Sequence, residues 1–374
     1  MSTAASRVVE KRKADGEASC YCDCSLAELS SEARLRLRRW QASDWMSTLA
    51  FAESYCDPPA QRVSYVMDGD GEIGEACFYR EEKWAGMFKS ISLMGRVEPS
   101  SKILQRLFCD CPADLIRIPL LLTTTVTAQP GECREIHFRR SADDYCIELP
   151  ASVEEYLSRL GSKTRKHLPY YLRRLKREWE KEWRVEQTSG LRITKESYGD
   201  LLALNRLRMD RKGRRSLWTE KLAEHRWGLA SEFGSLKSIH YRDRFVAGTL
   251  SFVYGKDAFL VVIAHDPEHD RLNLGNVCLW LTIEDLIARG ITRYHLLWGN
   301  SPYKEQFGAV AHPLYEVTVF MNPLAARVWR GAELLRIEKI WGLSNSATQK
   351  IAWFFSAARR DHPGQGASSR EGLT

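Results

Sequence analysis

The 374-residue sequence lacks long hydrophobic runs, and no segment approaches the roughly 18 uninterrupted apolar residues of a membrane-spanning helix. Residues 1–16 are polar and do not resemble a secretory signal. We therefore expect a cytoplasmic protein without a membrane span, whose ten cysteines stay reduced. Its net charge of +7 leaves contact with a membrane surface open.

The sequence also lacks the paired C-x2–4-C knuckles that hold structural zinc. Cys20, Cys22 and Cys24 form a C-x-C-x-C cluster, and Cys109 and Cys111 form a second C-x-C. In a strand this spacing points the thiols to one side, but it lacks the turn that brings them to one ion. We interpret these residues as incidental thiols and expect no metal. A zinc or redox role for the two clusters together is the alternative.

A chain of this length is longer than the chains that usually fold around a single hydrophobic core, so we expect two domains. Short strands and helices alternate in both halves, which predicts a mixed α/β (α+β) fold. We expect a flexible arm over residues 1–28 and an N-terminal domain over 29–150. Connecting helices then span 151–183, a C-terminal domain 184–345, and a helix and tail 346–374.

A basic segment joins the two predicted domains. Between Lys163 and Arg184 there are nine Lys and Arg residues but only three Glu. The pattern predicts a long helix over residues 162–183, and Pro169 should mark its first turn or a kink, because an interior proline costs about 3 kcal/mol. The positive charge favours an anionic partner such as tRNA, an acidic polysaccharide or a membrane surface; a solvated helix face is the alternative.

The most informative segment is 245–308. Two apolar strands precede a turn at His265, and residues 271–276 then open an apolar helix that ends near Arg289. The first turn of a helix carries unpaired N–H groups and a partial positive charge, which suit a pyrophosphate. Gly275 would let backbone approach such a ligand, and Asn273 or Asn276 could cap the helix. An ordinary strand-to-helix turn is the alternative.

The residues carry a family resemblance. Segments 245–250, 271–275 and 297–308 resemble the GNAT superfamily, and more closely its CelD-like or BioF2-like group, which is related to the FemABX aminoacyltransferases. Residues 162–166 with 173–175 are similar to the basic stretch of that group. The resemblance implies two tandem GNAT-like domains, joined here by the long basic helix. Residues 271–276 depart from the general superfamily pattern, because a single glycine is followed by Asn276.

The resemblance implies an acyltransferase that moves an acyl group from acyl-CoA, expected to be acetyl-CoA, to an unidentified acceptor. Its carrier-binding residues would be those of the turn: Arg271, Asn273, Leu274, Gly275 and Asn276. Lys304 would clamp a developing oxyanion, Tyr303 would act as general acid and His265 as general base. The acceptor would lie near Arg165, Lys166, Arg208, Trp298 and Asn300.

Two other functions stay open. One is an aminoacyl-tRNA-dependent transferase of the FemABX type, in which the basic helix contacts the tRNA backbone. The other is a non-catalytic GNAT-like protein that uses the basic helix to bind a polysaccharide or partner. Nothing in the sequence selects a sugar, a peptide or a small amine as the acceptor.

Overall fold

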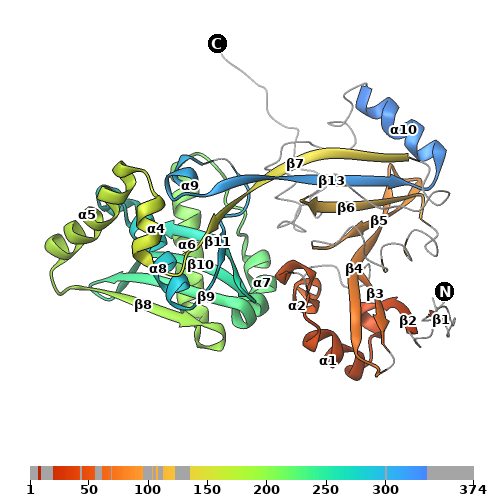
Figure 1. The fold of residues 1–374 in the computed structure, drawn as a ribbon, viewed down its shortest axis with the longest axis horizontal. Coiled ribbons are helices and arrows are strands. Elements are labelled where there is room, and N and C mark those ends of the chain that lie inside the picture. The colour runs from red at the N-terminus through yellow and green to blue at the C-terminus, as the bar shows by residue number, and fades with distance from the viewer. Residues whose placement is uncertain are drawn as a thin grey trace, which may run out of the picture.

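The computed structural model describes residues 7–9, 20–42, 44–54, 61–68, 70–95, 103, 107, 113–122, 135–299 and 301–334. It has the expected mixed α/β architecture, with one continuous sheet flanked by helices (Figure 1). Within this part of the chain, no helix is long and apolar enough to cross a membrane.

In the part of the N-terminal half that the structure describes, two short helices, α1 and α2, accompany one side of the sheet. Its strands pair in antiparallel fashion apart from one parallel pair, β5 with β6. The elements are β1 (Arg7–Val9), β2 (Cys20–Ser25), α1 (Ser31–Arg39), α2 (Leu49–Glu53), β3 (Gln61–Met67), β4 (Ile73–Trp84), β5 (Phe88–Leu93), β6 (Leu115–Leu121) and β7 (Glu135–Glu148).

The first helix of the C-terminal half is capped by a hydroxyl side chain. The Oγ of Ser152 accepts a hydrogen bond of 3.1 Å from the Glu155 N–H. The elements are α4 (Val153–Arg159), α5 (Ser162–Trp179), β8 (Trp183–Ser189), α6 (Lys195–Arg211), α7 (Glu220–Phe233), β9 (Gly234–Tyr241), β10 (Arg244–Tyr254), β11 (Asp257–His265), α8 (Leu274–Ala288), β12 (Arg293–His295), α9 (Pro302–Gln306), β13 (Val310–Phe320) and α10 (Pro323–Leu334).

The two halves repeat one strand plan. The sheet order is β1-β2-β3-β4-β5-β6-β13-β7-β12-β11-β10-β9-β8. In the N-terminal half, β2 to β5 are antiparallel, β5 is parallel to β6, and β6 is antiparallel to β13. In the C-terminal half, β8 to β11, then β12, then β7 pair in the same senses. This repetition agrees with two tandem domains.

Strands β7 and β13 run through both halves. Figure 1 shows them side by side as long strands that run from the C-terminal half near α9 into the N-terminal half, while α5 lies at the far end of the C-terminal half. The basic helix therefore links the halves in sequence but packs against α8. β13 and α10, which fall inside the segment expected to form the C-terminal domain, pack on the N-terminal half beside β6. β7 is one continuous strand of 14 residues.

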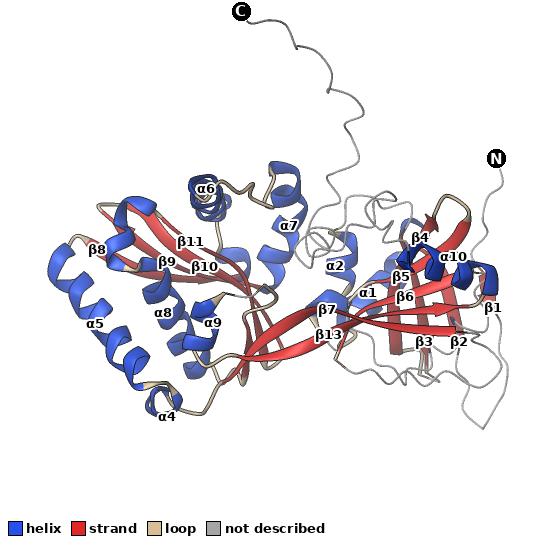
Figure 2. Cartoon of the chain, turned by 90° about the horizontal axis from the view of Figure 1, so that it is seen from above, coloured by secondary structure: helices blue, strands red, loops and turns tan. Residues whose placement is uncertain are grey.

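A shared core also joins the halves. Trp45 packs edge-to-face on Phe252, with ring centroids 4.9 Å apart. Arg226 of α7 donates a hydrogen bond of 2.9 Å to Ser54 Oγ, next to α2. Figure 2 shows α2 and α7 on the same side of the sheet, where the two halves meet. Burial of large aromatic side chains at this junction stabilises one arrangement of the halves.

Two sequence expectations are corrected. Residues 20–28 are not a flexible arm: β2 pairs with β3, and Leu26, in the short 3-10 turn that follows, is buried. Pro169 lies inside α5 and not in its first turn. Leu168, Leu175 and Trp179 are buried on one face of this helix, and that packing offsets the hydrogen bond lost at the proline.

Candidate functional site

The candidate site lies where strands β11 and β12 part. Their parallel pairing ends at Phe259 and His295, and among the described residues no further backbone pairing joins them. β11 continues to His265 beside β10. The chain after β12 instead follows β7, since Leu296 N–H donates to the Tyr145 carbonyl at 2.6 Å. The open side of β11 therefore faces the segment that leads into α9.

The N-terminus of α8 lies at the end of β11, as the sequence predicted. Asn273 is the N-cap residue in a left-handed conformation (φ 52°), and its side chain makes no capping hydrogen bond. Its carbonyl accepts the first helical bond, from Val277 N–H at 3.1 Å. The N–H groups of Leu274, Gly275 and Asn276 thus belong to the first turn, where a helix has no acceptors of its own. The geometry suits an anion.

Gly275 lies in close contact with the His265 ring. A Cβ at this position would lie 3.1 Å from Nδ1 of His265. The space beside the glycine is therefore occupied by the imidazole ring, and not only by a prospective ligand. The other ring nitrogen, Nε2, lies 2.8 Å from Asp270 Oδ1. His265 thus packs between Asp270 and the first turn of α8.

Basic side chains surround this turn. Arg271 is exposed and pairs with Glu178 at 3.3 Å. Arg174 of α5 donates to the Arg271 carbonyl at 3.1 Å, which attaches the basic helix to the turn. Lys212, at the end of α6, has its pKa lowered, chiefly by the neighbouring charge of Arg208, and Asp270 opposes that shift. Basic residues of α5 and of the end of α6 therefore lie near this turn.

Tyr303 and Arg208 belong to one neighbourhood. Burial raises the pKa of Tyr303, and the charge of Arg208 opposes that rise. Arg208 also donates a hydrogen bond of 3.2 Å to the Ile263 carbonyl on β11. The guanidinium thus connects β11 with the residue predicted to act as the acid. A tyrosine with a raised pKa stays protonated and can donate a proton.

Lys304 is buried, and its ammonium makes two hydrogen bonds to backbone carbonyls. Its Nζ donates hydrogen bonds of 2.9 Å to the carbonyl oxygens of Leu297 and Trp298. Burial lowers its pKa to about 8, while the Asp144 carboxylate opposes the shift. The ammonium holds the backbone of the segment that carries Trp298, which is half-buried against the core. A direct clamp on substrate, as the sequence predicted, would require Lys304 to leave these two carbonyls.

The other predicted acceptor residues are less closely connected. Arg165 and Lys166 are exposed in the first half of α5. No hydrogen bond or ion pair among the described residues joins either of them to Tyr303 or His265. Asn300 lies outside the described residues. Their roles stay predictions.

Sequence reasoning missed one buried pair at the parting of the strands. His295 Nδ1 lies 2.7 Å from Asp144 Oδ2, and both residues are almost fully buried. The two residues are separated by 151 positions, so no local motif points to them. Only the pairing of β12 with β7 brings them together.

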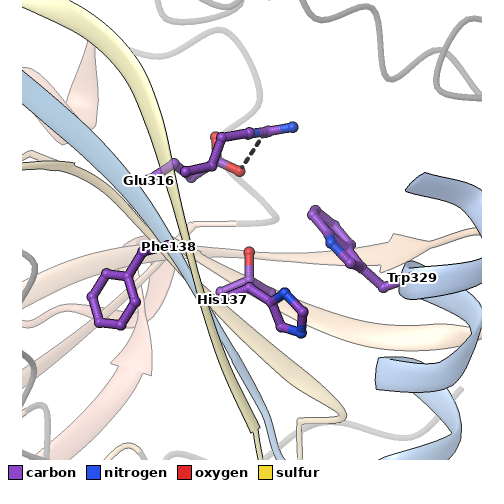
Figure 3. Close-up of a pocket in the computed structure, with 6 residues that line it drawn as sticks. His137, Phe138, Glu316 and Trp329 are labelled. Carbon is purple, nitrogen blue, oxygen red and sulfur yellow. Dashed lines mark hydrogen bonds and ion pairs between the residues drawn. The ribbon is translucent and has the colours of Figure 1, made fainter. Parts of the chain in front are cut away.

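A small pocket of about 30 Å³ lies elsewhere, on the β7 and β13 surface beside α10 (Figure 3). None of the predicted site residues lines it.

The structure places no cluster of three or more His, Cys, Asp or Glu side chains suited to a metal in the part of the chain it describes. Cys22 is buried on β2 and Cys24 half-buried, and burial raises the pKa of the Cys24 thiol to about 11. Cys109 and Cys111 lie outside the described residues, and so does the Cys20 side chain. The small pocket on β7 and β13, by contrast, is lined by His137, Phe138, Arg139, Glu316, Thr318 and Trp329.

Comparison with known proteins identifies the fold. Residues 162–305 match the model of the acetyltransferase (GNAT) domain. A crystal structure of FemX superposes with a TM-score of 0.58 at 12% identity, covering 79% of this chain and 97% of that one. A conserved protein of unknown function from Bacteroides thetaiotaomicron superposes with a TM-score of 0.52 at 12% identity, covering 78% and 98%. The sequence matches none of the curated proteins with which it was compared.

Proposed function

We propose that this chain transfers an acyl group from acyl-CoA to an amine or hydroxyl. Its GNAT-like, FemABX-related fold and the match of residues 162–305 to the acetyltransferase (GNAT) domain support the proposal. The observation that carries the proposal is the first turn of α8, which has no side-chain cap and lies where β11 and β12 part. The acceptor directly attacks the thioester in this proposal, with acetyl-CoA as the expected donor.

The carrier end of the site is assigned to the turn. The pyrophosphate would accept hydrogen bonds from the N–H groups of Leu274, Gly275 and Asn276, and Arg271 would add a positive charge. Arg271 is exposed and its ion pair with Glu178 is 3.3 Å long, so it can turn towards a phosphate at little cost. Asn273 presents its carbonyl to the helix and leaves its side chain for the ligand.

The reacting end is assigned to Tyr303. After attack, the C–S bond of the tetrahedral intermediate breaks and the departing thiolate takes a proton from the phenol. The raised pKa of Tyr303 keeps the proton on the phenol until then, and Arg208 stabilises the phenolate that forms. Solvent returns the proton to Tyr303 after the thiol leaves.

His265 remains the proposed base, with a constraint from its contacts. Nε2 is engaged by Asp270, so the proton of the attacking group has to go to Nδ1. That nitrogen lies beside Gly275, at the pyrophosphate end of the proposed site, so the proton would have to reach it from the acceptor through bridging water. The carboxylate of Asp270 fixes the orientation of the ring.

The donor is tested by calorimetry with acetyl-CoA and, separately, with aminoacyl-tRNA. We expect acetyl-CoA to bind and tRNA not to compete with it. If tRNA binds and acetyl-CoA does not, tRNA-dependent transfer replaces the proposed function. This second function is favoured by the exposed Lys163, Lys166, Arg173 and Arg177, which form one row on α5. Binding of neither would contradict both functions.

A further inference from the structure

The buried pair of His295 and Asp144 has a counterpart in the other half of the sheet. In the C-terminal half, His295 is the last residue of the parallel pairing and lies opposite Cys146, two residues from Asp144. In the N-terminal half, Arg117 is the last residue of the parallel pairing of β5 with β6 and lies opposite Thr318. Glu316 is two residues from Thr318. The positions of the two pairs therefore correspond in register.

The chemistry at the two positions differs. Glu316 Oε1 accepts hydrogen bonds from Arg117 at 3.0 Å and from Arg139 at 2.9 Å, so that pair is permanently charged. Figure 3 shows Glu316 in the small pocket that it lines together with His137 and Trp329. In the C-terminal half an imidazole replaces the guanidinium. The imidazole therefore lies at the point where β11 and β12 separate, which is also where the proposed site lies.

His295 has no ring atom left for a substrate. Its Nδ1–H donates to Asp144 at 2.7 Å, and its Nε2 lies 4.0 Å from the Cys146 thiol. One face of the ring stacks on Phe259 of β11, with centroids 4.6 Å apart and planes 10° apart. Burial raises the pKa of Cys146 to about 12, so its sulfur stays a thiol and can donate to Nε2. His295 is therefore attached to β11, β12 and β7 at once.

The chain that follows His295 is held by the same group of side chains. Leu296 pairs with Tyr145, the neighbour of Asp144. Lys304 holds the carbonyls of Leu297 and Trp298, and it interacts electrostatically with Asp144. Leu297 has a positive φ of 56°, a conformation that a leucine adopts only when its surroundings impose it. The segment from Leu296 to Tyr303 thus begins at a strained, tightly held point.

We propose that His295 is a positioning residue for the acyl-transfer site: held by Asp144 and stacked on Phe259, it fixes where β11 and β12 part and so places Trp298 and Tyr303. The link to turnover rests on the proposed function. The link to the position of segment 296–303 does not.

Two variants separate the contacts of His295. His295→Phe keeps a ring against Phe259 but removes the hydrogen bond to Asp144. His295→Asn places an amide near Nδ1 and keeps a donor for that carboxylate. The matched control is Arg117→Met, which removes the corresponding residue of the N-terminal half and leaves Glu316 paired with Arg139.

The first measurement is hydrogen exchange of the full chain, which needs no substrate. In His295→Phe we expect amide exchange in segment 296–303 to accelerate by about tenfold while β9 and β10 stay protected. His295→Asn should restore most of the protection, and Arg117→Met should leave this segment as in the parent. Unchanged exchange in His295→Phe, or equal acceleration in Arg117→Met, overturns the proposal. If His295→Phe does not fold, a His295→Asn profile that differs from the parent throughout the sheet overturns it too.

The second measurement is steady-state transfer from acetyl-CoA. In His295→Phe we expect kcat to fall by about tenfold with little change in the KM for acetyl-CoA, because Tyr303 is displaced while the α8 turn is intact. A rise in KM alone contradicts the positioning of Tyr303. If the parent neither binds nor uses acetyl-CoA, the proposed function fails, and the exchange experiment still decides the role of His295.

Discussion

The imidazole of His265 fills the space that a side chain at Gly275 would need, since a Cβ there would lie 3.1 Å from Nδ1. This contact couples the end of β11 to the first turn of α8. A change on either side should therefore be felt at the proposed carrier site and not only at the altered residue.

Gly275→Glu tests that site. We expect it to abolish acetyl-CoA binding, because the side chain displaces His265 and puts a carboxylate where the pyrophosphate would lie. Calorimetry measures the affinity, and thermal unfolding checks the fold. The control is Gly199→Glu on α6, where a Cβ meets nothing within 4 Å. If Gly275→Glu binds acetyl-CoA as the parent does, the carrier site is elsewhere.

Arg271→Ala should weaken acetyl-CoA binding without affecting stability. An exposed ion pair such as Arg271 with Glu178 contributes about 0–1 kcal/mol to folding, so the melting temperature should hardly change. Loss of one phosphate contact should raise the Kd by about fivefold at low salt, and the difference should shrink as salt is added. Arg192, exposed in the 3-10 turn at 190–192, supplies the control Arg192→Ala. Equal affinities at every salt concentration would remove Arg271 from the carrier site.

Tyr303→Phe should lower kcat by about 100-fold while changing the Kd for acetyl-CoA little, since general acid catalysis contributes 10²–10⁴-fold. Pre-steady-state and steady-state turnover measure the effect. Tyr170→Phe, at an exposed position on α5, should behave as the parent does. Turnover that is unaffected by Tyr303→Phe would exclude the phenol as the proton donor.

Lys304→Met should change how stability depends on pH. The folded-state pKa of Lys304 is about 8, below its ordinary value, so above pH 8 the unfolded chain binds more protons than the folded one. The contribution of Lys304 to the free energy of unfolding therefore rises with pH above 8 and levels off once the unfolded pKa is passed. Between pH 7 and 9.5 we expect the parent to gain about 2 kcal/mol relative to Lys304→Met, at roughly 1.4 kcal/mol per pKa unit. Urea unfolding at both pH values measures this, and a pH-independent difference would contradict the buried ammonium.

Much of the fold follows from local sequence pattern. The apolar helix α8 and the two strands before it, β10 and β11, follow from short-range periodicity and were predicted from it. Pro169 was misplaced because the local cost of proline is visible in sequence, whereas the packing of Leu175 and Trp179 that offsets it is not.

Only those parts of the candidate site that lie in contiguous sequence could be proposed from the sequence. The turn at 271–276 and Tyr303 lie in contiguous motifs. The contacts that define their surroundings, Arg208 with Ile263 and His295 with Asp144, join residues 55 and 151 positions apart. Such pairs depend on which strands become neighbours, and a single sequence carries little information about that.

The exchange of strands between the halves has a mechanical consequence. β13 pairs with β6 in the N-terminal half, and its first residues pair with Cys146 and Tyr145 of β7. Removing either half would therefore leave an unpaired strand edge in the other half. Fragments that end near residue 150 should aggregate when expressed alone, and recover solubility only when the missing piece is supplied in trans.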